Sequence, residues 1–224
     1  MANKSQEKEF DGTIRYLEGY EFQEFAEEDV YIPTQNKYAY FAPSWHFRHE
    51  LLTQELVNDI RKNKRQVLSV GSGAGYLERF LVKILGVKME QITLSDKHQV
   101  MPEGFERFTF DMYGKWPDFG KQFDYVLFPE SALLNVWPEQ GLQRPEELYH
   151  LIENSLVAMN RFGQMRINGH SQSEESAATV GRWLKRYYPS SKLTYNPNLI
   201  VVKSGCKAKA LLQSSDQYVA NLLF

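Results

Sequence analysis

Cysteine is almost missing from this sequence, since Cys206 is the only one among 224 residues. A single cysteine excludes an intramolecular disulfide and a zinc site built from cysteines, and it fits the reducing cytoplasm. Long hydrophobic runs are missing as well, because no stretch reaches the roughly eighteen apolar residues that a membrane-spanning helix needs. The start of the chain, MANKSQEKEF, lacks the apolar core of a signal peptide. These absences predict a cytoplasmic protein without a membrane segment.

The chain also lacks an excess of charge of either sign, because its formal net charge is −2 at pH 7. This balance provides no bulk attraction to nucleic acid or to an anionic membrane, so we expect no nucleic-acid partner. No GxxxxGK[ST] sequence occurs, which argues against phosphate chemistry on a Walker-type loop. His46 and His49, next to Glu50, are more typical of a solvated helix face than of a metal centre, and no metal is predicted.

A short apolar strand that ends in a glycine-rich turn is the most informative feature, in the sequence QVLSVGSGAG (Gln66–Gly75). The next residues, YLERFLVKILG, place apolar side chains every three or four positions, which predicts a helix with one apolar face that ends at Gly86. This order brings backbone N–H groups to a helix N-terminus, where glycines let a ligand approach the main chain. The alternative interpretation is an ordinary tight turn of an α/β protein.

Strands and helices alternate after this turn. The further strands are predicted at Ile92–Leu94, Phe108–Phe110, Tyr125–Phe128 and Gln164–Ile167. Polar residues follow them, at Asp96, Asp111, Glu130 and near His170. Helices are predicted from Pro145 to Met159 and from Glu174 to Tyr188. The alternation predicts an α/β fold, with a three-layer Rossmann-like sheet that is mostly parallel and has helices on both faces.

The last two predicted strands, Lys192–Tyr195 and Leu199–Lys203, are separated only by Asn-Pro-Asn. A parallel pair needs a crossover of about a dozen residues or more, so these strands must be antiparallel neighbours. We therefore predict that the seventh and last strand is reversed. A plain dinucleotide-binding sheet would not require such a strand.

Three parts of the chain are distinguished. Residues 1–64 are predicted to form a helical, aromatic-rich cap or lid, in which Ser44 begins a helix that runs to about Arg61. Residues 65–204 form the sheet domain. Residues 205–224 are predicted to dock on this domain or to take part in a dimer contact. A monomer and a homodimer both remain open.

The glycine turn, the acids that end the second and third strands and the terminal hairpin together resemble the class I S-adenosylmethionine-dependent methyltransferases. The resemblance covers about Gln66 to Lys203. It is best at VLSVGSGAG, which is similar to the glycine-rich first motif of that family. Ser69 departs from the motif, because an acid commonly stands at this position and organises the loop and the ligand from behind. The resemblance implies S-adenosylmethionine as the cofactor and methyl transfer as the activity.

The resemblance also implies a set of cofactor-binding positions: Gly71, Ser72, Gly73, Gly75, Asp96, Lys97, Asp111, Met112, Phe128 and Pro129. The glycine turn would contact the amino-acid end and the sugar, and Asp96 would accept hydrogen bonds from the two ribose hydroxyls. Asp111 would accept from the adenine amino group while Met112 packs on the ring. The alternative interpretation of both aspartates is a cap or turn acid.

Methyl transfer is a direct displacement at carbon from an activated donor, so neither a nucleophile nor a metal is obligatory. If a general base takes part, the candidates near the mouth of the site are Glu130, His46 and His170. The fourth strand ends in FPES, whereas family members that act on the amines of bases or of glutamine resemble [D/N]PP[Y/F] there. We therefore expect a small-molecule acceptor beneath the aromatic N-terminal segment, and a protein acceptor remains open.

Two other classes of function are left open. The first is a non-catalytic module with the same fold that binds S-adenosylmethionine or a protein partner. The second is an NAD-dependent oxidoreductase, for which Asp96 would also suit the ribose. The glycine spacing disfavours the oxidoreductase, because this chain has GxGxG, with Tyr76 where the third glycine of GxGxxG would fall.

Overall fold

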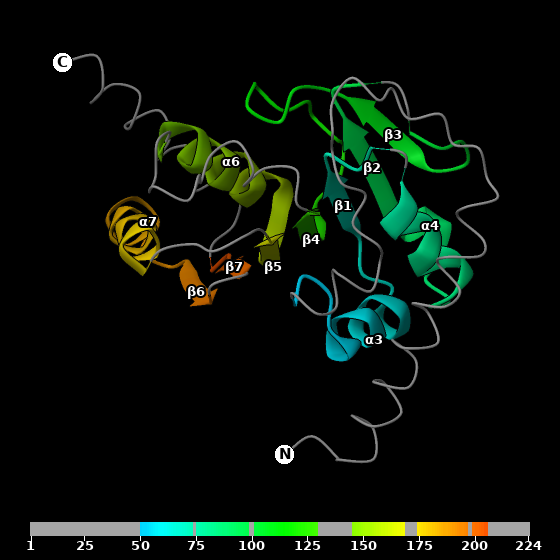
Figure 1. Ribbon diagram of the computed structural model, residues 1–224, viewed down its shortest axis with the longest axis horizontal. Coiled ribbons are helices and arrows are strands. Elements are labelled where there is room, and N and C mark those ends of the chain that lie inside the picture. Colours follow the sequence, from blue (N-terminus) through cyan, green and yellow to red (C-terminus); the bar gives the residue numbers. More distant parts are fainter. Residues whose placement is uncertain are drawn as a thin grey trace.

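A computed structural model of the protein describes residues 50–73, 75–98, 101–129, 145–168, 174–196 and 199–205. At its centre is a seven-stranded sheet in the order β3-β2-β1-β4-β5-β7-β6 (Figure 1). The strands are β1 (Val67–Val70), β2 (Ile92–Asp96), β3 (Glu106–Thr109), β4 (Phe123–Phe128), β5 (Met159–Asn168), β6 (Lys192–Asn196) and β7 (Leu199–Lys203). The labelled helices are α3 (Gln54–Asn63), α4 (Tyr76–Lys83), α6 (Pro145–Ala158) and α7 (Glu174–Tyr187).

The direction of the strands confirms the predicted Rossmann-like sheet. β1 pairs in parallel with β2 and β4, and the parallel pairing continues to β3 on one side and β5 on the other. β7 is antiparallel to both β5 and β6. The last strand of the chain is therefore the reversed one, as predicted, and it is inserted between β5 and β6 rather than placed at the edge of the sheet.

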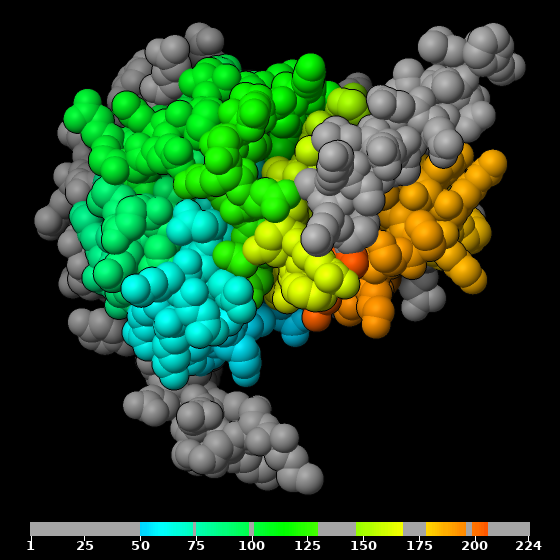
Figure 2. Space-filling model, turned by 180° about the vertical axis from the view of Figure 1, so that it is seen from behind, coloured from blue at the N-terminus to red at the C-terminus, as the bar shows by residue number. Residues whose placement is uncertain are grey.

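Helices cover both faces of the sheet, and each face has its own apolar cluster. Leu68 and Val70 of β1 point toward α6 and α7, whereas Val67 points toward α3 and α4. This alternation follows from the two-residue repeat of a strand. Figure 1 shows the two helix pairs on opposite sides of the sheet. From behind, Figure 2 shows α3 (cyan) at the lower edge and the α7–β6 region (orange) on the opposite flank.

The connection from β3 to β4, residues 110–122, covers one sheet face without forming a helix. Trp116 and Phe119 are buried in the cluster beneath α6. Their rings lie 6.2 Å from Phe128 and 5.3 Å from Phe123, between centroids. The Trp116 indole N–H donates to the carbonyl of Met112 at 2.8 Å, so its polar atom is also satisfied. Large rings thus supply the apolar cover that a crossover helix usually supplies.

The start of α3 corrects the predicted helix from Ser44 to Arg61. Thr53 is the N-cap, and its hydroxyl accepts the N–H of Leu56 at 3.2 Å, so α3 begins at Gln54. Residues 50–53 are not helical, and Glu50 has a φ of 59°. The Arg166 guanidinium donates hydrogen bonds to the carbonyl oxygens of Glu50 and Leu51, at 2.5 and 2.9 Å. These carbonyl groups therefore accept from a side chain instead of from the N–H groups of a helix. Ser44 itself lies outside the described residues.

Other boundaries also differ from the sequence prediction, among them the end of α4, which lies at Lys83 rather than at Gly86. Met159 was predicted at the end of a helix, but it begins β5, where it pairs with Phe123. The register then shifts before Gln164 pairs with Tyr125, which marks a bulge. β3 covers Glu106–Thr109 rather than Phe108–Phe110. Among the described residues, no helix combines the length and the apolar character needed to cross a membrane.

Candidate functional site

The turn after β1 is tied through its main chain to the end of β2. The N–H groups of Gly71 and Ser72 both donate to the carbonyl of Ser95, at 2.8 and 3.0 Å. The N–H of Gly73 donates to Asp96 Oδ2 at 2.9 Å, and the N–H of Gly75 closes the turn on the carbonyl of Ser72 at 2.9 Å. The predicted glycine turn and the predicted acid therefore meet at the carboxyl edge of the sheet, where open α/β sheets bind ligands.

Two glycines of this turn serve different purposes. Gly73 has a φ of 53°, and a Cβ atom there would have no neighbour within 4 Å among the described residues, so the main chain borders open space in that part of the structure. Gly75 has a φ of 68° and is the N-cap of α4, but its Cβ would lie only 2.7 Å from Pro102 Cγ. Gly73 therefore leaves room for a ligand, whereas Gly75 makes room for the 101–105 segment of the chain.

Asp96 holds the turn and keeps further acceptor capacity. Its Oδ2 accepts from Gly73, and its Oδ1 accepts the N–H of His98 at 2.9 Å. An ionised carboxylate offers about four acceptor positions, so each oxygen can take one more donor. The side chain is half-buried at the end of β2. Asp96 is therefore a turn acid, and it remains suited to a diol.

Asp111 lies at the neighbouring strand end, because the N–H of Phe110 donates to the carbonyl of Asp96 at 3.1 Å. Its exposed carboxylate accepts the N–H of Tyr113 at 3.0 Å, and its carbonyl accepts the N–H of Gly114 at 3.0 Å. These contacts are those of a turn acid. Met112 is partly buried against the cluster beneath α6. Contacts of Asp111 and Met112 with adenine remain a prediction.

The other predicted positions differ in their exposure. Lys97 is exposed directly after β2. Phe128 is fully buried, with its ring against Trp116, so only its main chain reaches the ligand edge of the sheet. Pro129 follows it and is partly exposed. The three candidate bases, Glu130, His46 and His170, lie outside the described residues, so their role stays a prediction.

Glu78, in the first turn of α4, is a candidate that reasoning from the sequence missed. Its carboxyl is buried beneath the glycine turn, and Oε1 accepts a hydrogen bond from the hydroxyl of Ser69. Burial raises the pKa of Glu78 to about 7, and the negative charge of Asp96 acts in the same direction, against the Ser69 hydrogen bond. The sequence contained a signal for the burial of Glu78, because this residue stands three positions before Leu81 and therefore on the same side of the helix, which is the buried side.

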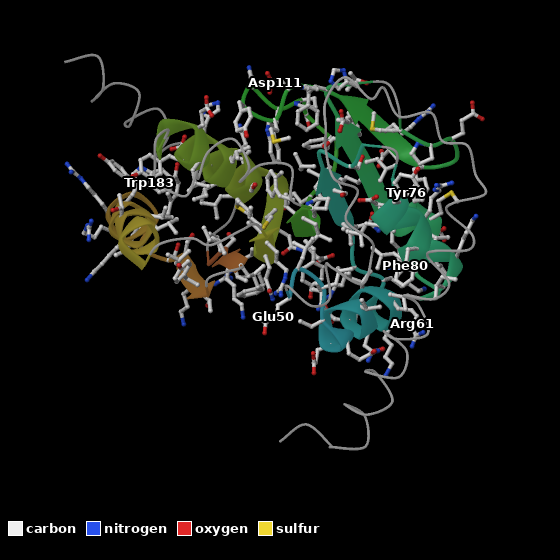
Figure 3. All side chains as sticks on the ribbon, viewed as in Figure 1. Glu50, Arg61, Tyr76, Phe80, Asp111 and Trp183 are labelled. Atoms are coloured by element: carbon white, nitrogen blue, oxygen red, sulfur yellow. The ribbon has the colours of Figure 1, made fainter. Side chains whose placement is uncertain are left out.

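A separate cavity of about 230 Å³ lies over β5, β6 and β7. It is lined by Glu50, Gln164, Arg166, Thr194, Tyr195, Leu199, Val201 and Lys203. None of these is a candidate cofactor-binding residue. Figure 3 shows Asp111 at the upper edge of the molecule and Glu50 at the lower side, so the cavity is distinct from the glycine-turn site.

The strand order, the reversed β7 and the glycine turn after β1 are those of the class I S-adenosylmethionine-dependent methyltransferase fold. No protein-family model and no curated protein sequence matches the chain.

Solved structures with a similar fold include two methyltransferases. The MycE methyltransferase from the mycinamycin biosynthetic pathway, in complex with Mg and SAH, is 14% identical, with a TM-score of 0.51 over 87% of this chain and 55% of that chain. The plantazolicin methyltransferase BpumL, in complex with a pentazolic desmethylPZN analogue and SAH, is 11% identical, with a TM-score of 0.50 over 71% of this chain and 84% of that chain. At such identities the likeness establishes the fold and leaves the activity to be argued from the site.

Proposed function

We propose that this protein binds S-adenosylmethionine at the turn between β1 and α4 and transfers its methyl group to a small-molecule acceptor. The observation that carries the proposal is the Gly73–Asp96 contact of 2.9 Å at the carboxyl edge of the sheet. It places a carboxylate with spare acceptor capacity beside a stretch of main chain that borders open space.

The residues present fit the parts of this cofactor. Asp96 suits the two hydroxyls of the ribose, because both of its oxygens retain an acceptor position. The N-terminus of α4 has no side-chain cap at Gly75, and a helix N-terminus favours the carboxylate of an amino acid. The adenine would then lie toward Asp111 and Met112, and Lys97 would lie at the sugar edge.

When bound, the cofactor supplies a methyl group on a positively charged sulfur, which takes back the electron pair of the broken S–C bond as the acceptor bonds to carbon. The chain has to orient the acceptor in line with that bond and exclude water. The Asp96 carboxylate and the turn from Gly71 to Gly75 would fix the donor. Glu130, His46 and His170 are the proposed general bases for an acceptor that must lose a proton.

A small-molecule acceptor is supported by three observations. The end of β4 lacks the [D/N]PP[Y/F] pattern, the charge of the chain is nearly balanced, and the two similar structures are a methyltransferase of the mycinamycin biosynthetic pathway and one bound to a pentazolic desmethylPZN analogue. We further propose a cytoplasmic protein that is a monomer or a homodimer, with residues 1–64 as a cap over the acceptor. The second candidate function is a non-catalytic S-adenosylmethionine-binding module, which Ser69 favours because it replaces the usual acid.

Titration calorimetry with S-adenosylmethionine, its demethylated product S-adenosylhomocysteine and NAD tests the proposal. The wild type should bind the first two in the micromolar range, and Asp96→Ala should weaken both. Binding of NAD alone would contradict the proposal and favour an oxidoreductase. If S-adenosylmethionine binds but no acceptor in a broad screen yields S-adenosylhomocysteine, the non-catalytic module is the better description.

A further inference from the structure

A carboxyl group with an unused oxygen lies beneath the glycine turn. Glu78 is 1% exposed, and its Oε1 accepts from the Ser69 hydroxyl. Its Oε2 is buried and has no hydrogen-bonding partner among the described residues. Buried polar atoms nearly always have a partner, so an unpartnered carboxyl oxygen beside a proposed ligand site calls for a functional explanation.

The surroundings of Glu78 favour a positive ligand group nearby. Asp96, from β2, is the charged residue that acts on it in the described part of the chain. On its own helix, the next residue, Arg79, places its guanidinium 5.1 Å from the centre of the Tyr76 ring. From β1, Ser69 offers a hydroxyl while its carbonyl accepts from Ser95 at 3.1 Å. Two carboxyl groups therefore flank the turn, and a cation between them would relieve their repulsion.

Ser69 stands at a position that connects Glu78 with the glycine-rich motif. Ser69 occupies the place where the family that this chain resembles commonly has an acid, and its side chain points from β1 toward the carboxyl of Glu78. The chain therefore has a carboxyl group in this region after all, supplied by α4 instead of β1. Burial of a carboxyl group costs free energy, because desolvation disfavours its charged form, so a binding role would explain why Glu78 is buried here.

We propose that Ser69 and Glu78 together replace the acid that commonly ends the first strand, and that Glu78 is a positioning residue for the charged amino group at the amino-acid end of the cofactor. The inference rests on the proposed function, since it presumes S-adenosylmethionine as the ligand. It assigns to α4 a role in recognising the cation of the ligand, beside its role at the ligand carboxylate.

Binding of a cation beside Glu78 should be coupled to the loss of a proton from its carboxyl group. In the free protein the pKa of Glu78 is raised to about 7 by burial and by Asp96, so the carboxyl is partly protonated near neutral pH. A bound cation favours the charged form and lowers this pKa. Ligand binding near pH 7 should therefore release a fraction of a proton, and affinity for the cationic ligand should increase as the pH rises through 7.

Calorimetry at pH 7, in two buffers that differ in ionisation enthalpy, measures both the affinity and the released protons. The two probes are S-adenosylhomocysteine and 5′-methylthioadenosine, which carries the same adenosine without the amino-acid end. Glu78→Gln should weaken S-adenosylhomocysteine roughly tenfold, the size expected for a lost charged hydrogen bond, and should abolish proton release. It should leave the affinity for 5′-methylthioadenosine unchanged.

The double variant Ser69→Asp/Glu78→Gln returns the carboxyl to β1 and should restore the affinity for S-adenosylhomocysteine. The matched control is Glu153→Gln. Glu153, on α6, is a second carboxyl whose pKa burial raises, and it accepts the Tyr188 hydroxyl at 2.7 Å, away from the glycine turn. This control should alter neither the affinity nor the proton release.

Each outcome decides between the two proposals. Wild-type protein that binds neither S-adenosylmethionine nor S-adenosylhomocysteine would refute the proposed function itself. Wild-type binding that Glu78→Gln leaves unchanged, protons included, would overturn the role of Glu78 alone. An equal loss of both probes would also overturn it, because Glu78 would then shape the turn rather than recognise the amino group. Thermal unfolding of each variant verifies that the compared proteins are folded.

Discussion

The N–H of Gly73 donates to Asp96 Oδ2 across 2.9 Å, although the two residues are 23 positions apart in the chain. This contact joins the turn after β1 to the end of β2. Because the same carboxylate also accepts from His98, the position of the turn and the orientation of Asp96 depend on each other. A ligand that binds one of them is therefore sensitive to changes in the other.

The first prediction concerns the Asp96 carboxylate. Asp96→Asn keeps the shape of the side chain but removes the charge and one acceptor oxygen. A hydrogen bond to a charged group contributes about 2 kcal/mol, so the affinity for S-adenosylhomocysteine should fall by more than tenfold. Calorimetry on Asp118→Asn provides the comparison, because Asp118 is an exposed turn acid whose Oδ1 accepts the N–H of Gly120 at 2.9 Å, and it is not among the proposed cofactor-binding residues. Equal effects of the two substitutions would refute the specific role of Asp96.

The second prediction concerns Gly73 and Gly75, which differ in what surrounds their main chain. Gly73→Ala places a methyl group in open space at a φ of 53°, so it should cost about 1 kcal/mol of stability and strongly weaken ligand binding. Gly75→Ala adds a clash 2.7 Å from Pro102 to its own φ of 68°. It should lose about 3 kcal/mol by strain and overpacking together.

Urea unfolding measures the stabilities and calorimetry measures the affinities of these two variants. The expected order is that Gly75→Ala is the less stable and Gly73→Ala the poorer binder, once both are compared below their unfolding transitions. A Gly73→Ala variant that binds S-adenosylhomocysteine as the wild type does would show that the ligand does not approach this part of the main chain.

The third prediction is the pH dependence of stability that Glu78 imposes. Its pKa rises from an ordinary 4.5 to about 7 on folding, so the folded state binds more protons than the unfolded state between these values. The contribution is thus fully present below pH 4.5 and is lost as the pH rises through 7. The loss is on the order of 3 kcal/mol if the whole shift is realised.

Glu78→Gln should remove this dependence, because the amide does not ionise. In urea unfolding, the variant should match the wild type near pH 5 and exceed it in stability near pH 8. The raised pKa would be contradicted if the unfolding free energy of the wild type were the same at pH 5 and pH 8, as it should be for the variant.

The sequence was sufficient for the sheet, and it predicted the glycine turn and the acid Asp96, which the structure joins by a hydrogen bond. The alternation of strands and helices predicted the parallel core, and the short Asn-Pro-Asn link predicted the reversed β7, because these signals are local in the chain. The burial of Glu78 was not predicted, since it depends on the Ser69 hydroxyl that faces it from β1. The 110–122 connection has no periodic pattern, and its packing depends on distant rings such as Phe128.

The start of α3 shows the same limit. The apolar spacing from Phe47 to Ile60 suits one long helix. The chain nevertheless turns at Glu50, because Arg166, more than one hundred residues later, donates hydrogen bonds to the carbonyl oxygens of Glu50 and Leu51. Local propensity was overridden there by a long-range contact, as tertiary packing routinely does. The same reasoning explains why Phe128, predicted from its place at a strand end, has its ring in the core rather than at the ligand edge.

The last prediction concerns the amino end of the sheet, where α3 is fastened to β4. The Tyr125 hydroxyl donates to Asp59 Oδ2 at 2.5 Å, and Arg65 Nε donates to the same oxygen at 3.0 Å. Burial acts to raise the pKa of Asp59, but the hydrogen bonds from Tyr125, Asn63 and Arg65 outweigh it and hold the pKa below its ordinary value. This contribution to stability is present above the unfolded pKa and is lost as the pH falls through the folded pKa.

Tyr125→Phe should therefore cost about 1 to 2 kcal/mol of unfolding free energy at pH 7, the usual range for a hydrogen bond to a charged group. The difference from the wild type should shrink as the pH falls below 3.8, the ordinary pKa of the carboxyl, because a protonated Asp59 is a weaker acceptor. Binding of S-adenosylhomocysteine should be unchanged, since Tyr125 and Asp59 lie at the edge of the sheet opposite to the glycine turn. Urea unfolding at pH 7 and at a pH below 3.8 measures the loss of stability and its dependence on pH. A destabilisation that is the same at both would assign the role of Tyr125 to packing rather than to its bond with a charged carboxylate.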